Sequence, residues 1–124
     1  MNPNSFDSEF QKLKDKYLIT FPNKLGEIEA LLVAQDLATL QERFHKLKGN
    51  GQTYGFPEIT EIARLVEEHG KLKSPDFLRW AALGLGLLNV IHPLLVKKET
   101  VHLDTLPDYK LLTESLTTIS RGNP

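Results

Sequence analysis

Apolar residues recur every three or four positions along most of this 124-residue chain, which is the spacing of helices with one buried face. In the first such stretch, residues 6–33, Pro22 interrupts the pattern and predicts either one kinked helix or two helices with a tight joint. Three more helices are predicted for residues 37–54, 57–69 and 74–92. The apolar stripe that opens the first helix is expected to belong to the core and consists of Phe6, Phe10, Leu13, Tyr17 and Phe21.

Capping and helix-breaking residues mark where the predicted helices begin and end. Asp36 suits the N-cap of the second helix, and Gly55 suits its end, where glycine can adopt a left-handed conformation. Pro57 suits the first turn of the third helix and Gly70 its end. The connections between these helices are therefore short, and short connections favour antiparallel neighbours.

These features predict an all-α fold, an antiparallel up-down four-helix bundle. No segment alternates with the period of a strand for long enough to predict a sheet. Residues 107–119 have the spacing of one extra short helix, which would either dock on the bundle or fray. We therefore expect residues 1–95 to form the bundle and residues 96–124 to form a C-terminal extension.

The most apolar stretch of the chain is residues 80–96. It includes two glycines, an asparagine, a histidine and a proline, so it falls short of the ~20 apolar residues that a membrane-spanning helix needs. A helix that is apolar on nearly all sides is typically buried in a protein core. We expect a core helix and no membrane insertion.

Composition narrows the class of protein further. The net charge is −1, so the protein lacks the strong positive electrostatic field that is typical of a nucleic-acid binder. The chain has no cysteine, which excludes disulfides, thiol catalysis and cysteine zinc sites. The first ten residues lack the basic start and apolar run of a signal peptide, so we expect a cytoplasmic protein. The four histidines show no metal-ligand spacing and no phosphate-binding loop is present, so neither a metal nor a cofactor is expected. Three of these histidines are interpreted as ordinary boundary or surface residues, namely His69, His92 and His102.

His45 is the residue that carries candidate chemistry. On a helix with about 100° per residue, His45 lies roughly 135° from the mean direction of the apolar stripe of residues 37–54. The imidazole should therefore face solvent. A neutral imidazole is nucleophilic near its ordinary pKa of about 6.5, which suits phosphoryl transfer through the ring.

Three neighbours on the same helix support this interpretation. Lys48, at i+3, can reach an anion attached to His45. Gly49, at i+4, leaves the surface beside the ring bare, so that a bulky partner can approach it. Gly49 and Gly51 each cost a helix about 1 kcal/mol relative to alanine, so both need a reason.

Helix heights point to one residue of the third helix. The second helix rises ten residues from His45 to Gly55, and the third helix returns from Pro57, so Glu67 should be level with His45. Its carboxylate could hold the Nδ1–H of the ring and leave Nε2 free to attack. Glu68 points further outward. A solvated acidic face explains Glu67 equally well, and an exposed histidine near a lysine is common in helices without any function.

The run His45-x-Leu47-Lys48-Gly49, with Gly55 ten residues after the histidine, resembles the histidine-containing phosphotransfer (HPt) domain family. The resemblance extends over roughly residues 10–91. It implies a four-helix bundle in which His45 is phosphorylated, Lys48 stabilises the phosphoryl group and Gly49 gives access to a receiver domain. It also implies a carrier that is not an enzyme, with no kinase activity or ATP site of its own, and a magnesium ion supplied by the receiver.

On this resemblance the partners are response-regulator receiver domains and a sensor histidine kinase. The docking face is expected to lie around His45 and to include Gln41 and Gln52. The expected function is a phosphorelay intermediate between the receiver domain of a hybrid sensor kinase and a response-regulator aspartate. Two alternatives stay open: the phosphoacceptor domain of a chemotaxis-type histidine kinase, and a helical adaptor that binds receivers without being phosphorylated.

Overall fold

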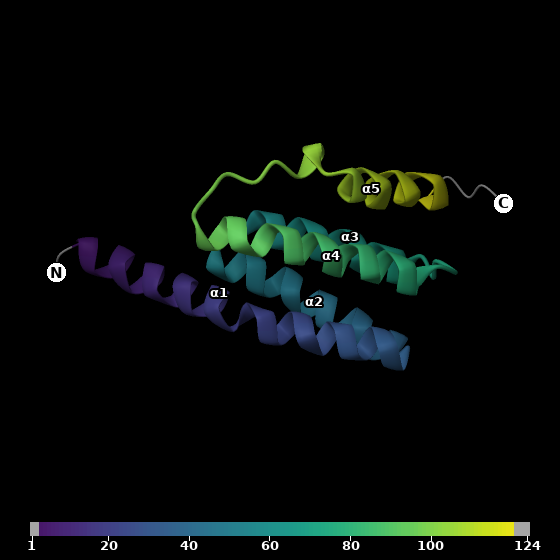
Figure 1. The fold of residues 1–124 in the computed structure, drawn as a ribbon, viewed down its shortest axis with the longest axis horizontal. Helices are drawn as coiled ribbons and strands as arrows, with labels where there is room; N and C mark the ends of the chain where they lie inside the picture. The colour runs from purple at the N-terminus through teal and green to yellow at the C-terminus, as the bar shows by residue number, and fades with distance from the viewer. Residues whose placement is uncertain (1–2, 121–124) are drawn as a thin grey trace.

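The computed structural model describes residues 3–120, and the side chains of residues 6–118. The described residues form helices without any strand (Figure 1). The elements are α1 (Pro3–Ala34), α2 (Leu37–Tyr54), α3 (Pro57–Lys71), α4 (Phe77–Val96), the 3-10 helix η1 (Leu103–Thr105) and α5 (Pro107–Ser120). The predicted all-α bundle with an extra C-terminal helix is confirmed.

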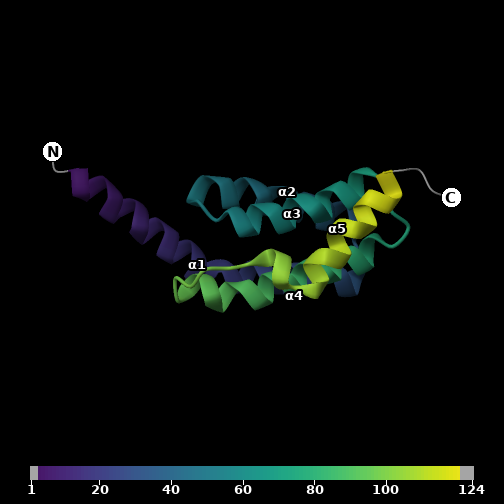
Figure 2. The same cartoon turned by 90° about the horizontal axis from the view of Figure 1, so that it is seen from above.

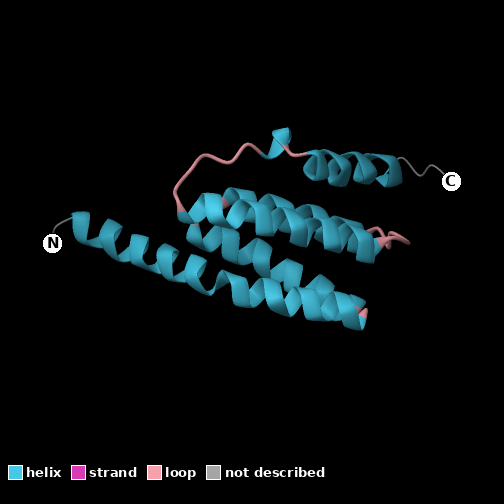
Figure 3. Ribbon diagram, viewed as in Figure 1, coloured by secondary structure: helices cyan, strands magenta, loops and turns pink. Residues whose placement is uncertain are grey.

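The first four helices form a closed ring of neighbours. The α2–α3 pair is the most extensive, and α1 contacts both α2 and α4, while α3 also packs on α4. A long loop after α4 leads through η1 to α5, which lies along α3 and α4 (Figures 1 and 3). Leu112 on α5 is completely buried, so the C-terminal helix docks on the bundle instead of fraying.

α1 is a single helix that continues through Pro22. Because proline has no N–H, the carbonyl of Leu18 has no partner one turn ahead. His92 of α4 supplies the partner: its Nε2–H donates to the Leu18 oxygen at 2.7 Å, and its ring stacks on Phe21. A contact between helices thus replaces the hydrogen bond that the proline removes.

The outer part of α1 projects past the end of the bundle (Figure 2). The expectation that the whole opening stripe is core is therefore wrong for its first residues, because Phe6 is 72% exposed and Leu13 is 52% exposed. The stripe enters the core only at Tyr17, where the other helices begin to cover it.

The predicted end of α3 and both predicted ends of α4 differ from the structure. α3 continues through Gly70 to Lys71, so Gly70 does not end the helix. The glycine instead makes room for the side chain of Gln41, since a Cβ at Gly70 would lie 2.8 Å from Cδ of Gln41. α4 starts at Phe77 instead of residue 74 and continues past Pro93 to Val96. The carbonyl of Asn89, which Pro93 leaves unpaired, belongs to an exposed residue and can be hydrated.

α4 is the most apolar helix. Its 20 residues include an 18-residue window with mean hydropathy 1.4, so the helix is long and apolar enough to cross a membrane by length and composition alone, contrary to the expectation from residues 80–96. In the bundle this helix packs between α1 and α3 and buries Trp80, Leu88 and Ile91. A core helix meets the same criteria, so the finding is weak evidence for a membrane span.

Candidate functional site

His45 lies in the middle of α2 with its side chain 65% exposed, as the helical pattern predicts. Its Nδ1 is 2.9 Å from Oε1 of Glu67 on α3. An ionised carboxylate has no proton to donate and can only accept a hydrogen bond, so the ring donates its Nδ1–H to Glu67. These two side chains, 22 residues apart in sequence, therefore lie level with each other on neighbouring helices, as predicted from helix heights.

Glu67 is the centre of a small charge cluster. Only 5% of its side chain is exposed, and its Oε2 lies 2.8 Å from Nζ of Lys48. Lys71, one turn further along α3, brings its Nζ to 3.5 Å from Oε1. One buried carboxylate thus holds the imidazole and faces two ammonium groups.

The cluster fixes the charge of Glu67. Burial alone would raise the pKa of this carboxyl, and it is the largest single influence. The hydrogen bonds and charges of Lys48 and His45 together outweigh burial and lower the pKa of Glu67 to about 2. The carboxylate is therefore ionised throughout the physiological pH range and remains able to accept the hydrogen bond from the His45 ring.

This arrangement leaves one ring nitrogen of His45 without a protein partner among the described residues. An imidazole that donates Nδ1–H carries its lone pair on Nε2, and within the described residues no protein group pairs with that nitrogen. The second ring nitrogen is thus held by an anion while the first is open to a partner. The arrangement suits attack on a phosphorus centre, with Lys48 and Lys71 close enough to interact with an added anion.

The two helical glycines beside His45 have different roles. A Cβ at Gly49 would meet nothing within 4 Å, so this position leaves an open surface. A Cβ at Gly51 would clash with the side chain of Thr60 and lie 2.8 Å from its backbone nitrogen. Gly51 therefore permits close packing of α2 on α3, which is a different reason for a helical glycine from the open surface at Gly49.

The two predicted docking glutamines differ in exposure. Gln41, one turn before His45, is half-buried because it packs over Gly70 of α3. Gln52, two turns after His45, is exposed.

Lys71 is the member of this cluster that the sequence reasoning missed. Its spacing of four residues from Glu67 was a usable signal, because residues four apart on a helix are neighbours. Once Glu67 had been placed level with His45, that spacing would have added Lys71.

His69 corrects a second prediction. It is completely buried instead of lying at the boundary, and its ring stacks on Trp80 with centroids 4.8 Å apart. Its Nε2 lies 3.3 Å from the carbonyl of Leu112 and 3.1 Å from Oγ of Ser115, both on α5. The docking of α5 accounts for this burial. The other two histidines are a half-buried His92 and an exposed His102.

The described residues include no group of three histidine, cysteine or acidic side chains that could hold a metal ion.

Comparisons with known proteins give one match. A family model described as "Hpt domain" matches residues 12–104, which run from within α1 through α2, α3 and α4 to the start of η1. No curated protein and no solved structure matches the chain.

Proposed function

Because the chain belongs to the Hpt domain family, the phosphocarrier modules of two-component signalling, we propose that it is a phosphorelay intermediate in which His45 carries the phosphoryl group. The donor would be the receiver domain of a hybrid sensor kinase, and the acceptor the aspartate of a response regulator. The observation that carries this proposal is the exposed imidazole whose Nδ1–H is held 2.9 Å from a buried carboxylate.

The transfer step follows from the tautomer. The Nε2 lone pair of His45 attacks phosphorus of a receiver aspartyl phosphate, the N–P bond forms, and the acyl O–P bond breaks with its electron pair leaving on the aspartate. No proton has to leave Nε2, because the ring proton is on Nδ1. The phosphorylated ring becomes cationic, and the Glu67 carboxylate 2.9 Å away stabilises that charge. The return step is the reverse, onto a second receiver aspartate.

The surrounding residues have separate roles in this proposal. Lys48, 24% exposed, and Lys71, 54% exposed, would turn toward the phosphoryl oxygens and lower the repulsion between two anionic partners. Gly49 would let the receiver approach the ring, and Gln41 and Gln52 would border the docking face. The carrier needs no nucleotide site, since the partner brings the phosphoryl group, and we place it in the cytoplasm, where receiver domains and kinases would meet it.

The test is phosphate uptake from a panel of phosphorylated receiver domains by the wild type and by His45→Gln. We expect acid-labile, base-stable label on the wild type and none on the variant. Because His45 is outside the core, the variant should keep the helical circular dichroism of the wild type.

The other outcomes separate the alternatives. Direct labelling of His45 by a histidine kinase with ATP, without any receiver, would favour the phosphoacceptor domain of a kinase. Receiver binding that persists in His45→Gln, with no label on either protein, would favour the adaptor and overturn the carrier.

A further inference from the structure

The outer part of α1 carries an apolar helix face that the bundle leaves largely uncovered. From Pro3 to Lys16 this segment measures about 21 Å at 1.5 Å per residue. At the inner end of this segment Lys14 is half-buried, with its Nζ 5.0 Å from the ring centroid of Phe56. Phe6, Phe10 and Leu13 lie along one side of this segment, and the first and last of these are well exposed. Figure 2 shows this part of the helix extending beyond the other helices. The stripe continues the one that α1 buries in its own bundle from Tyr17 onward.

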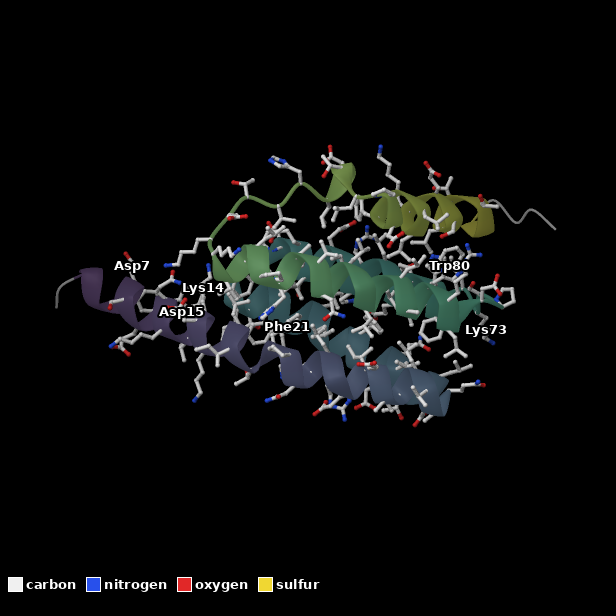
Figure 4. The ribbon with its side chains drawn as sticks, in the orientation of Figure 1. Asp7, Lys14, Asp15, Phe21, Lys73 and Trp80 are labelled. Atoms are coloured by element: carbon white, nitrogen blue, oxygen red, sulfur yellow. The ribbon has the colours of Figure 1, made fainter. Side chains whose placement is uncertain are left out.

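Charged residues flank this stripe in an ordered way. Asp7 and Glu9 lie toward its beginning, and Lys14 and Lys16 lie one to two turns later. Figure 4 shows Asp7 near the projecting tip and Lys14 nearer to the bundle. If Phe10 and Leu13 are the a and d positions of a heptad, all four charged residues occupy the flanking e and g positions.

We propose that the outer part of α1 pairs with the same segment of a second copy of this chain in an antiparallel two-helix contact. A twofold axis between Phe10 and Leu13 places Phe10 of each copy opposite Leu13 of the other copy. Both of these apolar side chains are then covered. Phe6 then reaches the end of the other bundle, near Tyr17 of the second copy.

The charges decide the direction of the pairing. In the antiparallel arrangement e faces e and g faces g, so Asp7 meets Lys14 and Glu9 meets Lys16, and symmetry makes each contact twice. A parallel pairing at the same layers would give only Glu9 a basic partner. The surface is therefore complementary to itself in one orientation, which favours a second copy over an unrelated partner.

The dimer leaves the phosphotransfer residues accessible. His45 lies about 15 Å from the end of α2 at Gly55, on the side that faces α3. The contact involves the projecting part of α1 and the end of the bundle at Tyr17, which stacks on Tyr54 beside that turn. Each dimer would present two equivalent sites. The inference does not depend on the proposed function, because its test measures association alone.

The experiment is sedimentation of the whole chain over a range of concentrations up to about 1 mM, where a weak dimer is populated. We expect the wild type to shift from the 14.0 kDa monomer to twice that mass. Asp7→Lys/Glu9→Lys should weaken the dimer about tenfold or more, and Lys14→Glu/Lys16→Glu should do the same, because all four contacts become repulsive.

Two further samples identify the pairing. The two variants mixed together should associate about as well as the wild type, since every contact is attractive again, and so should the chain with all four substitutions. Lys110→Glu/Glu114→Lys, which reverses two exposed charges on α5, should leave the dimer unchanged. Circular dichroism checks that each variant stays helical.

A wild type that stays monomeric throughout the range would overturn the proposal. A dimer that none of the flanking substitutions weakens would show that the copies meet elsewhere, and a mixture no stronger than its components would exclude the antiparallel pairing.

Discussion

His45 and His69 are imidazoles on neighbouring helices of one bundle, yet their surroundings are opposite. His45 is exposed, with one nitrogen held by an anion and the other open. His69 is buried between Trp80 and α5, and its Nε2 lies against Leu112 and Ser115. Because the two side chains are chemically identical, the difference between them lies in which ring nitrogen has a partner and in what covers the ring.

The contrast should be sharpest in stability. We expect His69→Ala to lower the free energy of unfolding by about 2–4 kcal/mol, because it opens a cavity beside Trp80 and removes the contact with α5. His45→Ala should lower it by less, about 1 kcal/mol, because the ring itself is exposed and only its hydrogen bond to the buried Glu67 carboxylate is lost. Urea unfolding followed by circular dichroism measures both, and equal losses would contradict the comparison.

The pH dependence adds a check on the same histidine. Burial lowers the pKa of His69 below its ordinary value of 6.5, although the bond to Leu112 acts in the other direction. The unfolded chain therefore binds the proton more readily than the folded one. The stability that depends on neutral His69 should be complete above pH 6.5 and decline as the pH falls below it, and His69→Ala should lack this decline.

Glu67 should show the next largest effect, since it gives His45 its environment. Its pKa is about 2 in the folded chain and 4.5 in a free side chain, so ionised Glu67 stabilises the fold above pH 4.5, and this is lost as the pH falls through about 2. We expect Glu67→Gln to be less stable than the wild type by about 2 kcal/mol near neutral pH.

A pH series of unfolding experiments measures the loss and its disappearance in acid. The adjacent Glu68→Gln is the matched control, because its pair with Lys71 is at the surface and should contribute less than about 0.5 kcal/mol. A stability difference for Glu67→Gln that stayed constant down to pH 2 would refute the assigned ion cluster.

The smallest expected effect separates open from packed positions on α2 itself. Gly49→Ala should raise the free energy of unfolding by about 0.5–1 kcal/mol, because alanine favours the helix and its methyl group meets open space. Gly51→Ala should lower it, since the methyl group would push against Thr60. Thermal unfolding of the two variants checks the signs, and a shared sign would mean that the two glycines have equivalent surroundings.

The sequence predicted the parts of this molecule that depend on one helix, or on two helices joined by a short turn. Gly55 ends α2 with a φ of +75°, and the tight turn after it made the height of Glu67 predictable from residue counting alone. The helical spacing also gave the exposure of His45.

The predictions failed where distant segments meet. His69 looked like a boundary residue because its burial depends on α5, which is 43 residues away at Leu112. Gly70 was predicted to end its helix, but a glycine is needed there because the side chain of Gln41, on another helix, packs against it. The spacing of residues within one helix predicts neither contact, since both depend on how separate helices pack against one another.

The hydrogen bond between His92 and the Leu18 carbonyl has a consequence for how the length of this protein can change. A shift of α1 by one residue would move that carbonyl about 1.5 Å along the axis and turn it by about 100°, so the bond exists in a single alignment of α1 on α4. Residues can be gained or lost at the outer end of α1 without disturbing that alignment. A single deletion between Pro22 and the turn at Gln35 would instead be incompatible with one of two features: either this hydrogen bond is lost, or the turn that leads from α1 into α2 moves from its position.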